Sequence, residues 1–297
     1  MTFGFIQGGG GNVRYDGTDL IGPDGTAISG IPTYTWAGKP AASATTGRVI
    51  GITNTIETNG VLAFFLSDGT NYLQIGEVQT TLAKVMAATV APTITGLKVR
   101  ATDVGITGRG ILYVANGSTM ILGQGRQLFY SGLGTRSAPL GQVTIDASGT
   151  GTNGTHLQVS SSPQIVTFPA NLLPSGSLVT VESEIYRSSG TNTAAARGYI
   201  GTDTVTPGNA NTNQQFYGYT FTGSNKFKND GQKFYLSSTT RIVGTGWSDG
   251  SVSTSDAAFE GTTKVNAAST MYLSFCMVNG TLNEVWDYKY IRVYLGA

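Results

Sequence analysis

The chain repeats one stretch of its own sequence, and this repeat constrains the fold more than any other feature. The first copy reads GRVIGITN from Gly47 and then, after a variable segment, GVLAFFLSDGTNYLQIG. The second copy reads GLKVRATD from Gly96 and then GILYVANGSTMILGQG. Asp68 of the first copy maps onto Asn116 of the second, an offset of 116 − 68 = 48. A duplicated unit of this size is typical of a modular rod or stalk.

Each copy contains two apolar runs on either side of an Asp-Gly or Asn-Gly pair. These pairs favour a two-residue type I′ turn, in which both central residues need positive φ, so we predict a β-hairpin around Asp68 and another around Asn116. The repeat predicts β module 1 over residues 33–85 and β module 2 over residues 86–136. The run TLAKVMAA, Thr81 to Ala88, favours helix but is too short to be stable alone. We interpret it as a linker turn.

The composition agrees with packed β modules. Glycine makes up 42 of the 297 residues, about twice its usual share of ~7%. Charged residues make up only 12% and hydrophobic residues 39%, which is enough apolar material for packed cores. A net charge of +1 provides no basic stripe for nucleic acid, and no apolar run approaches the ~20 residues of a membrane span. We expect neither nucleic acid binding nor membrane insertion.

The N-terminal segment, residues 1–32, has the composition of an arm. Four consecutive glycines, Gly8 to Gly11, pack nothing and give the backbone great freedom. Two Asp-Gly turns follow among short apolar pieces, and such a segment can add strands to a partner. We interpret residues 1–32 as an attachment arm; the alternative is a frayed terminus.

The C-terminal part, residues 137–297, is long enough for one β-sandwich and follows a boundary of small residues at Ser131–Gly141. The segment Leu178–Arg187 alternates apolar and polar residues with period two, and Ile291, Val293 and Leu295 alternate in the same way near the end. Strands are expected at Gln164–Phe168, Leu178–Arg187, Gln215–Phe221, Lys233–Leu236, Met271–Val278 and Glu284–Leu295. The predicted fold class is therefore all-β, with hairpin modules followed by an antiparallel, jelly-roll-like β-sandwich head.

Residues that could do chemistry are scarce. His156 is the single histidine and Cys276 the single cysteine, so a metal cluster or an intrachain disulfide is not expected. Glu182 and Glu184 project to one face of a strand and could form a glycosidase pair, but a solvated strand face is the stronger interpretation. We predict no catalytic residues, no metal and no cofactor, and hence no enzymatic activity.

Aromatic residues are the best candidates for a binding site. Tyr217, Tyr219 and Phe221 share one face of a predicted strand, and Trp247 lies in a glycine-rich loop. Flat aromatic rings with polar groups nearby are what sugar binding uses. We predict a ligand-binding site at these four residues; the alternative is core filling or a subunit interface.

The first copy carries a further pattern. WAGKP at residues 36–40, GRVI at 47–50 and FLSDGT at 65–70 together resemble a small module of tailed-bacteriophage structural proteins. The resemblance covers roughly residues 33–78, and the second copy lacks the WAGKP segment. In that family the module recurs in tail-fibre and virion-appendage chains ahead of a C-terminal β domain.

The resemblance implies a virion structural protein, a fibre or spike component of a tailed bacteriophage. We expect a homotrimer, as such fibres usually are, because small glycine-rich β modules bury little alone and gain core by association. The arm is expected to bind other virion proteins, and the head a cell-surface glycan or protein. Because the N-terminus lacks the features of a signal peptide, we expect synthesis in the host cytoplasm and location in the virion. The alternatives are a capsid or neck decoration fibre without a receptor role, and a polysaccharide depolymerase or deacetylase.

Overall fold

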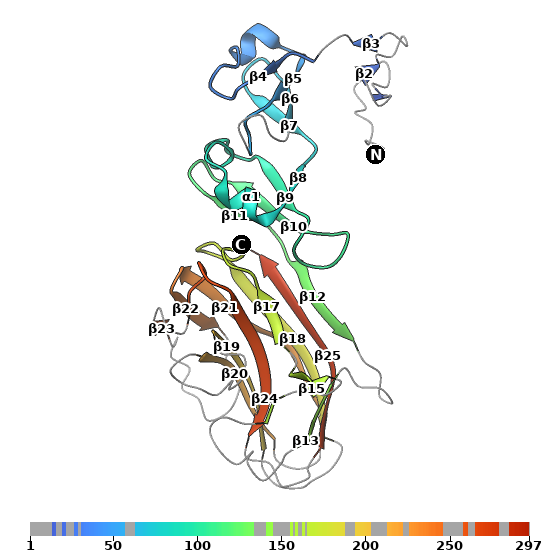
Figure 1. The fold of residues 1–297 in the computed structure, drawn as a ribbon, viewed down its shortest axis with the longest axis vertical. Coiled ribbons are helices and arrows are strands. Elements are labelled where there is room, and N and C mark those ends of the chain that lie inside the picture. The colour runs from blue at the N-terminus through green and yellow to red at the C-terminus, as the bar shows by residue number, and fades with distance from the viewer. Residues whose placement is uncertain are drawn as a thin grey trace.

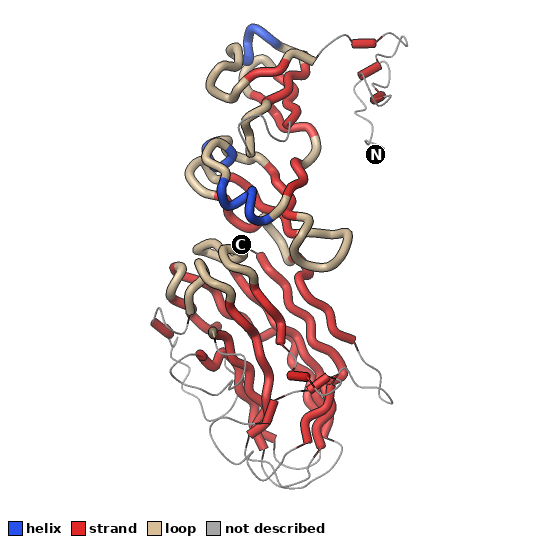
Figure 2. The backbone as a smooth tube through the Cα atoms, viewed as in Figure 1, coloured by secondary structure: helices blue, strands red, loops and turns tan. Residues whose placement is uncertain are grey.

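The computed structural model describes residues 14–15, 20–21, 27–28, 31–56, 63–133, 141–144, 155–156, 158–159, 162–163, 165–187, 194–202, 213–221, 226–245, 258–260, 265–278 and 285–296. Two small β units follow one another along the long axis of the molecule, and a larger β-sandwich forms its C-terminal end (Figure 1). Strands dominate every part, and the described helical segments are short (Figure 2). The all-β prediction is confirmed.

The first β unit, which we call repeat 1 (residues 31–76), is a four-stranded sheet in the order β4-β5-β6-β7. Strand β4 runs parallel to β5, and the other neighbours are antiparallel. The strands are β4 (Thr33–Tyr34), β5 (Val49–Ile52), β6 (Ala63–Ser67) and β7 (Tyr72–Ile75), with the 3₁₀ helix η1 (Ala42–Thr45) between β4 and β5.

The second β unit, repeat 2 (residues 78–123), has the same architecture. Its sheet has the order β8-β9-β10-β11, again with a parallel first pair and antiparallel pairs after it. The elements are β8 (Val78–Thr80), α1 (Leu82–Ala87), the 3₁₀ helix η2 (Ala91–Thr93), β9 (Lys98–Ala101), β10 (Ile111–Ala115) and β11 (Met120–Leu122). The duplication inferred from the sequence is therefore present in the fold.

The run TLAKVMAA is not a linker turn, so that interpretation was wrong. It forms helix α1, which connects β8 to β9 inside repeat 2 and buries Leu82 and Val85. The Thr81 hydroxyl accepts a hydrogen bond from the Lys84 amide, and the Leu82 amide donates to Asp103 Oδ1 at 2.7 Å. Burial and these end bonds stabilise a helix that could not form alone. The expected boundary between residues 85 and 86 falls within α1.

The two hairpins are present, but the predicted turn type is wrong. Each loop has four residues, with a backbone bond from Asp68 N to Asn71 O in repeat 1 and from Asn116 N to Thr119 O in repeat 2, both 3.1 Å. In the described part of the chain, Asn171 is the one non-glycine residue with positive φ. Asp68 and Asn116 therefore do not have positive φ. A type I′ turn would need positive φ at both central positions.

Hydrogen bonds inside the two repeats match pair by pair. The Gly47 amide donates to Ser67 O at 2.8 Å, and the Gly96 amide donates to Ala115 O at the same distance. Both glycines have positive φ, 73° and 82°, which explains why glycine recurs at this position. The glycines of the sequence repeat therefore mark the places where the chain turns into β5 and β9.

The connection between the parallel strands differs. Cross-strand partners Thr33 and Gly51 are 51 − 33 = 18 positions apart in repeat 1. Their counterparts Gln79 and Arg100 are 100 − 79 = 21 positions apart in repeat 2. The longer connection holds α1, whereas the shorter one holds the turn at residues 36–38.

The C-terminal unit, which we call the head, consists of two antiparallel sheets. The larger has the order β16-β15-β13-β25-β18-β21-β22-β23, with β12 also paired to β25, and the smaller has the order β14-β24-β19-β20, with β17 also paired to β24. The larger sheet contains β12 (Gln127–Leu133), β13 (Gly141–Thr144), β15 (Gln158–Val159), β16 (Ser162–Pro163), β18 (Leu178–Arg187), β21 (Lys226–Ser238), β22 (Arg241–Thr245), β23 (Ala258–Glu260) and β25 (Val285–Gly296). The smaller contains β14 (Thr155–His156), β17 (Ile165–Phe168), β19 (Ala194–Gly201), β20 (Asn213–Phe221) and β24 (Met271–Val278).

The head's sheets bury one apolar core between them. The apolar side of the alternation expected for β18 is confirmed, because Val179, Val181 and Ile185 are each at most 3% exposed, but Thr180 on the other side is buried as well, at 3%. The rings of Phe275 in the smaller sheet and Tyr288 in the larger are 6.1 Å apart, so the two sheets contact directly. Strand β12 precedes the boundary expected at residue 137 and already belongs to the larger sheet.

A β-bulge in β25 decides which of its residues reach this core. Partners of β18 step from Tyr290 to Tyr288, so Lys289 is an extra residue in the ladder. Before the bulge Trp286 and Tyr288 are buried, and after it the odd-numbered residues from Ile291 onward are buried. The extra residue reverses the alternation.

The N-terminal arm contains three two-residue strands in the described residues. They are β1 (Arg14–Tyr15), β2 (Leu20–Ile21) and β3 (Ala27–Ile28), and they form one antiparallel sheet in sequence order. The predicted arm therefore pairs its short apolar pieces with one another.

Candidate functional site

The predicted binding residues lie at one edge of the described part of the head. Tyr217, Tyr219 and Phe221 occupy alternate positions of β20, the last strand in the order of the smaller sheet. Register pairs Tyr219 with Ala196 and Phe221 with Ala194, so the aromatic positions lie opposite small residues of β19. Trp247 lies outside the described residues. The four-residue site thus stays a prediction.

A different aromatic surface lies on the larger sheet of the head. Even-numbered residues at the end of β25 face away from the core, while the odd-numbered ones are buried. We define the outer tyrosine face as Tyr290, Arg292 and Tyr294 of β25 together with Arg126 and Glu182. The guanidinium of Arg292 lies 5.2 Å from the ring centroid of Tyr290.

Arg126 joins this face from the segment between repeat 2 and β12. It directly precedes β12, and its guanidinium lies 3.9 Å above the ring centroid of Tyr294. The same guanidinium donates to Glu182 Oε1 at 2.5 Å. Glu182 is also the cross-strand partner of Arg292, so both arginines and the glutamate belong to the same face of the sheet. The Arg126 guanidinium therefore contacts an aromatic ring and a carboxylate at the same time.

The outer tyrosine face offers both apolar and hydrogen-bonding surface. Two partly exposed phenol rings supply apolar area, although a guanidinium already lies 3.9 Å from the Tyr294 ring and 5.2 Å from the Tyr290 ring. The guanidinium groups donate and the Glu182 carboxylate accepts hydrogen bonds. Leu133, 62% exposed, is the cross-strand partner of Tyr290 and extends the apolar part. Tyrosine and arginine are the residue types enriched in binding surfaces.

The sequence predicted the alternation in β25 but not this face. Its members come from three segments, at Arg126, Glu182 and residues 290–294, which only the strand pairing brings together. One signal was present, because Tyr290, Arg292 and Tyr294 alternate with the apolar residues of a strand.

The glutamate pair considered for glycosidase chemistry has a structural environment. Glu182 is ion-paired with Arg126, and Glu184 is the cross-strand partner of Tyr290. His156 is in strand β14, where its backbone pairs with Cys276 of β24. Among the described residues, no group of three or more His, Cys, Asp and Glu is arranged to hold a metal ion.

The junction between repeat 2 and the head is tightly bonded. Tyr113 in β10 is fully buried, and its hydroxyl donates to Leu172 O in the head at 2.7 Å. Burial raises the pKa of Tyr113, with the negative charge of Asp103 as a second cause, so the hydroxyl stays protonated and can donate. In the head, the Phe129 ring stacks on Phe168 at 5.3 Å, which anchors β12 to β17.

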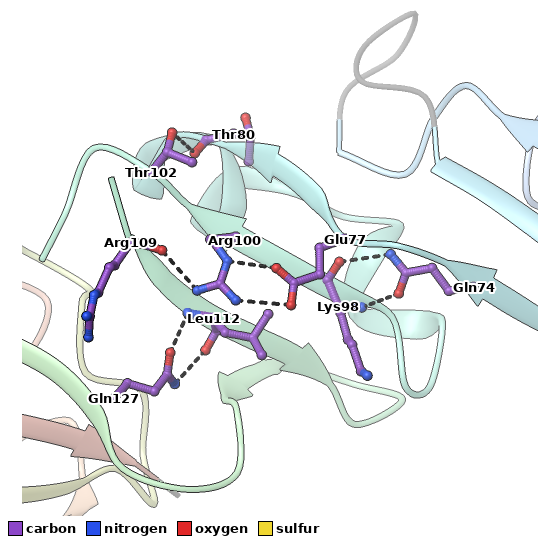
Figure 3. A network of polar contacts seen from close by, with 9 residues as sticks. All are labelled: Gln74, Glu77, Thr80, Lys98, Arg100, Thr102, Arg109, Leu112 and Gln127. Atoms are coloured by element: carbon purple, nitrogen blue, oxygen red, sulfur yellow. Dashed lines mark hydrogen bonds and ion pairs between the residues drawn. The ribbon is translucent and has the colours of Figure 1, made fainter. Parts of the chain in front are cut away.

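Two glutamine side chains each bind the backbone of repeat 2, one from the head and one from repeat 1 (Figure 3). Gln127 of the head accepts a hydrogen bond from Leu112 N at 2.6 Å and donates to Leu112 O at 2.9 Å. Gln74 of repeat 1 does the same with Lys98 of repeat 2, at 2.6 Å and 2.9 Å. Each carboxamide pairs with both the donor and the acceptor of one residue, as a neighbouring strand would.

An ion pair lies beside the Gln74 contact (Figure 3). Arg100 donates to both oxygens of Glu77, at 2.7 Å and 3.0 Å, and to the Arg109 carbonyl at 3.0 Å. This bidentate pair fixes the segment between β7 and β8 to the sheet of repeat 2.

The WAGKP segment forms a compact structural cluster. The Lys39 ammonium lies 3.7 Å from the ring centroid of Trp36 and donates to the Trp36 carbonyl at 3.0 Å. Burial lowers the pKa of Lys39. Trp36 in turn packs 5.4 Å from Phe65 of the core. The segment therefore closes repeat 1 over its own core, the role that α1 has in repeat 2.

No helix in the described residues has the length and apolar character needed to cross a membrane. No protein-family model matches the chain, and no curated protein matches it. Among solved structures, the chain is similar to "Structure of infectious bursal disease virus Gt strain", with 11% sequence identity and a TM-score of 0.27. The similarity covers 81% of this chain and 44% of that one, so this chain spans less than half the length of its counterpart. The proposed function therefore rests on this chain's own residues.

Proposed function

We propose that the chain is a virion structural protein, a fibre or spike subunit of a tailed bacteriophage whose head binds the host surface. The observation that carries the proposal is the order of parts: two repeats of one topology in line with a β-sandwich (Figure 1). Such an order holds a terminal domain away from the point of attachment. The resemblance of residues 33–78 to a phage tail module supports the bacteriophage assignment.

The head supplies the binding surface in this proposal. The outer tyrosine face combines flat rings with guanidinium and carboxylate groups, which suits a glycan with apolar ring faces and hydroxyl edges. The face as defined carries both signs, Arg126 and Arg292 together with Glu182, and Arg126 is already paired with Glu182. The predicted residues Tyr217, Tyr219, Phe221 and Trp247 form a second candidate surface in the same domain.

Single heads would bind weakly. A ring stacked on a sugar contributes on the order of 1 kcal/mol, so two rings fall well short of the ~4 kcal/mol of a millimolar complex. Several heads on one particle would supply the missing strength through avidity. We therefore also propose a homotrimer, attached to other virion proteins through residues 1–32.

A non-enzymatic role is part of the proposal. The Glu182 Oε1 atom lies 2.5 Å from the Arg126 guanidinium, and this ion pair supports a structural role for the Glu182 carboxylate. The proposal includes no catalytic residue, metal or cofactor.

Binding of the purified full-length protein to host cells tests the proposal. Tyr290→Ala and Arg292→Ala should each lower cell binding at least tenfold, and Trp247→Ala tests the second surface separately. Arg48→Ala, which removes an exposed arginine from repeat 1, serves as the control and should bind like the wild type.

The outcomes separate the alternatives. Immunogold labelling of particles without any host binding would replace adhesion by a decoration role. Reducing ends or acetate released from host polysaccharide would instead establish a depolymerase or deacetylase. Absence of the protein from particles would overturn the proposal.

A further inference from the structure

The hairpin turn of repeat 2 holds the side-chain amide of an asparagine in a ring of donors. Asn116 Oδ1 accepts hydrogen bonds from the backbone amides of Ser118 and Thr119, at 3.0 Å and 2.8 Å. The hydroxyls of the same two residues also donate to it, at 3.1 Å and 3.4 Å. Donors that converge on one carbonyl oxygen stabilise negative charge when it develops there, as in an oxyanion hole. The carbon of this amide, Cγ, is therefore prepared for attack by a nucleophile.

The nucleophile is supplied by the next residue. Gly117 has positive φ, 101°, and residues 116–119 are all exposed to water. Because glycine has no Cβ, its backbone nitrogen can be approached closely. The Gly117 amide donates to Pro92 O at 3.1 Å, so this bond has to open before the nitrogen can react. Hydrogen bonds at exposed turns open locally at little cost in free energy.

Repeat 1 shows that the same turn accepts a carboxylate in place of the amide. Asp68 occupies the position of Asn116, and its Oδ1 accepts hydrogen bonds from the amides of Asn71 and Thr70, at 2.6 Å and 2.7 Å. These bonds lower the pKa of Asp68, so the backbone of the turn stabilises a negatively charged side chain. Repeat 2 offers the same two amides, and hydrolysis of Asn116 would give a side chain for which its turn is already shaped.

We propose that Asn116 is a modification site, at which the folded protein exchanges the side-chain amide of asparagine for a carboxylate. The Gly117 nitrogen forms a bond to Asn116 Cγ and releases its proton, the side-chain nitrogen leaves as ammonia, and a cyclic imide remains. Water then adds to Cγ, the bond between Cγ and the Gly117 nitrogen breaks, and that nitrogen regains a proton. The net reaction consumes water and releases ammonium, with no oxidant or reductant.

The modified protein differs in charge and in its response to acid. Its formal net charge falls by one unit from +1, and the turn of repeat 2 gains a titratable group equivalent to Asp68. Addition of water to the other imide carbonyl, that of the backbone, gives isoaspartate with the same mass. The modification goes beyond the proposed function, because it requires neither host binding nor incorporation into a particle.

Peptide mapping of the full-length protein by mass spectrometry tests the inference. After incubation at mildly alkaline pH, the peptide with Asn116 should show the mass increase of an amide converted to an acid. Asn71 is the matched control within the chain, since it is exposed in the equivalent turn of repeat 1 but is followed by Tyr72. Conversion at Asn116 should be several times the conversion at Asn71. The same incubation in concentrated urea gives the reactivity of the unfolded chain.

Two results would overturn the inference. One is a folded protein that keeps Asn116 intact under conditions that convert it in urea, because the fold would then protect the site. The other is equal conversion of Asn71, because the glycine would then have no part in the reaction. Asn116→Asp carries the product from the start and should melt at the wild-type temperature. A clearly lower melting temperature for this variant would contradict a turn shaped for the carboxylate.

Discussion

Repeat 1 and repeat 2 have sheets of the same strand order, but different segments cover the core of each sheet. Strand order, strand direction and the hydrogen bonds at Gly47 and Gly96 agree, yet Trp36 covers the core in one and α1 covers it in the other. The comparison teaches that the four strands and their glycine turns define this unit. The connection between the parallel strands is free to change length and secondary structure, provided that it buries apolar side chains over the same core.

The repeats also differ in how each is joined to the next unit of the chain. Repeat 1 holds repeat 2 through Gln74 at the outside of the sheet, where the side chains are exposed. Repeat 2 holds the head through the buried Tyr113 and through Gln127. The second joint should therefore be the stiffer of the two. Substitutions in the cores, at the joints and at the turns can test these differences.

The largest effect is expected from Phe65→Ala. Phe65 is 1% exposed in the central strand of repeat 1, and losing it should destabilise that unit by about 3–5 kcal/mol. Hydrogen exchange should show lost protection in β5–β7 while the pairing of β12 with β25 stays protected. Tyr113→Ala, the equivalent position in repeat 2, should instead reduce protection in both repeat 2 and the head. Equal, purely local effects of the two changes would contradict the difference between the joints.

Tyr113→Phe makes repeat 2 resemble repeat 1, which has Phe65 at this position. The change removes one hydroxyl and leaves the buried Leu172 carbonyl without its donor, which costs about 1–3 kcal/mol. Thermal unfolding of the head should shift downward. Tyr72→Phe removes a hydroxyl that bonds Pro40 O inside repeat 1, so it should leave the head's transition in place. A head that melts as in the wild type after Tyr113→Phe would show that this bond does not couple the units.

Gln127→Ala and Gln74→Ala form a matched pair. Each removes two hydrogen bonds to one backbone residue, which should cost about 1 kcal/mol in each case, and Gln127→Ala also removes a longer 3.4 Å bond to Gly123 O. Small-angle X-ray scattering should show greater bending for Gln74→Ala, because the other contact at that joint is the partly exposed Arg100–Glu77 pair, whereas the buried Tyr113 hydroxyl also holds the second joint. Equal bending of both variants would mean that the joints have the same stiffness.

The smallest effect is expected at the two hairpin turns. Backbone amides of Asn71 and Thr70 donate to Asp68 and hold the pKa of its carboxyl below the usual 3.8. A depressed pKa in the folded state stabilises the turn above the unfolded pKa, and this stabilisation is lost as pH falls through the folded value. The turn of repeat 1 should therefore loosen in acid.

Asn116 makes the corresponding bonds to Ser118 and Thr119 without a titratable group. Amide chemical shifts of Thr70 and Asn71 should change with pH between about 5 and 2, while those of Ser118 and Thr119 stay constant. Asp68→Asn should remove the difference. Persisting acid sensitivity at residues 70 and 71 in that variant would assign it to another group.

Local sequence patterns predicted the strands well and their partners poorly. The alternation in β18 and the repeat of glycines depend on neighbouring residues, so they could be read directly from the sequence. The helix α1 was missed because its stability comes from burying Leu82 and Val85 against a sheet, and isolated propensity contains no such information. The parallel pairing of β8 with β9 was missed for the same reason.

The candidate site illustrates a second limit. The alternation of Ile291, Val293 and Leu295 in the sequence leaves Tyr290 and Tyr294 on the opposite face of the strand, and Glu182 was expected on a strand face. That Arg126 stacks on Tyr294 and bonds Glu182 depends on strands paired across more than a hundred positions. By contrast, the aromatic residues of β20 could be grouped from the sequence alone, because they are two positions apart in one strand.

Strand β25 has a consequence for how the protein is made. It pairs with β12, β13 and β18, and its contact with β12 joins Gln127 to Leu295, which are 295 − 127 = 168 positions apart. The repeats close their sheets within about 50 residues and can fold as soon as they leave the ribosome. The larger sheet of the head remains split until β25 has been synthesised. During that interval each nascent chain carries two completed repeats and an open sheet in the head, so we expect the head to be the part whose apolar surface and strand edges are exposed longest.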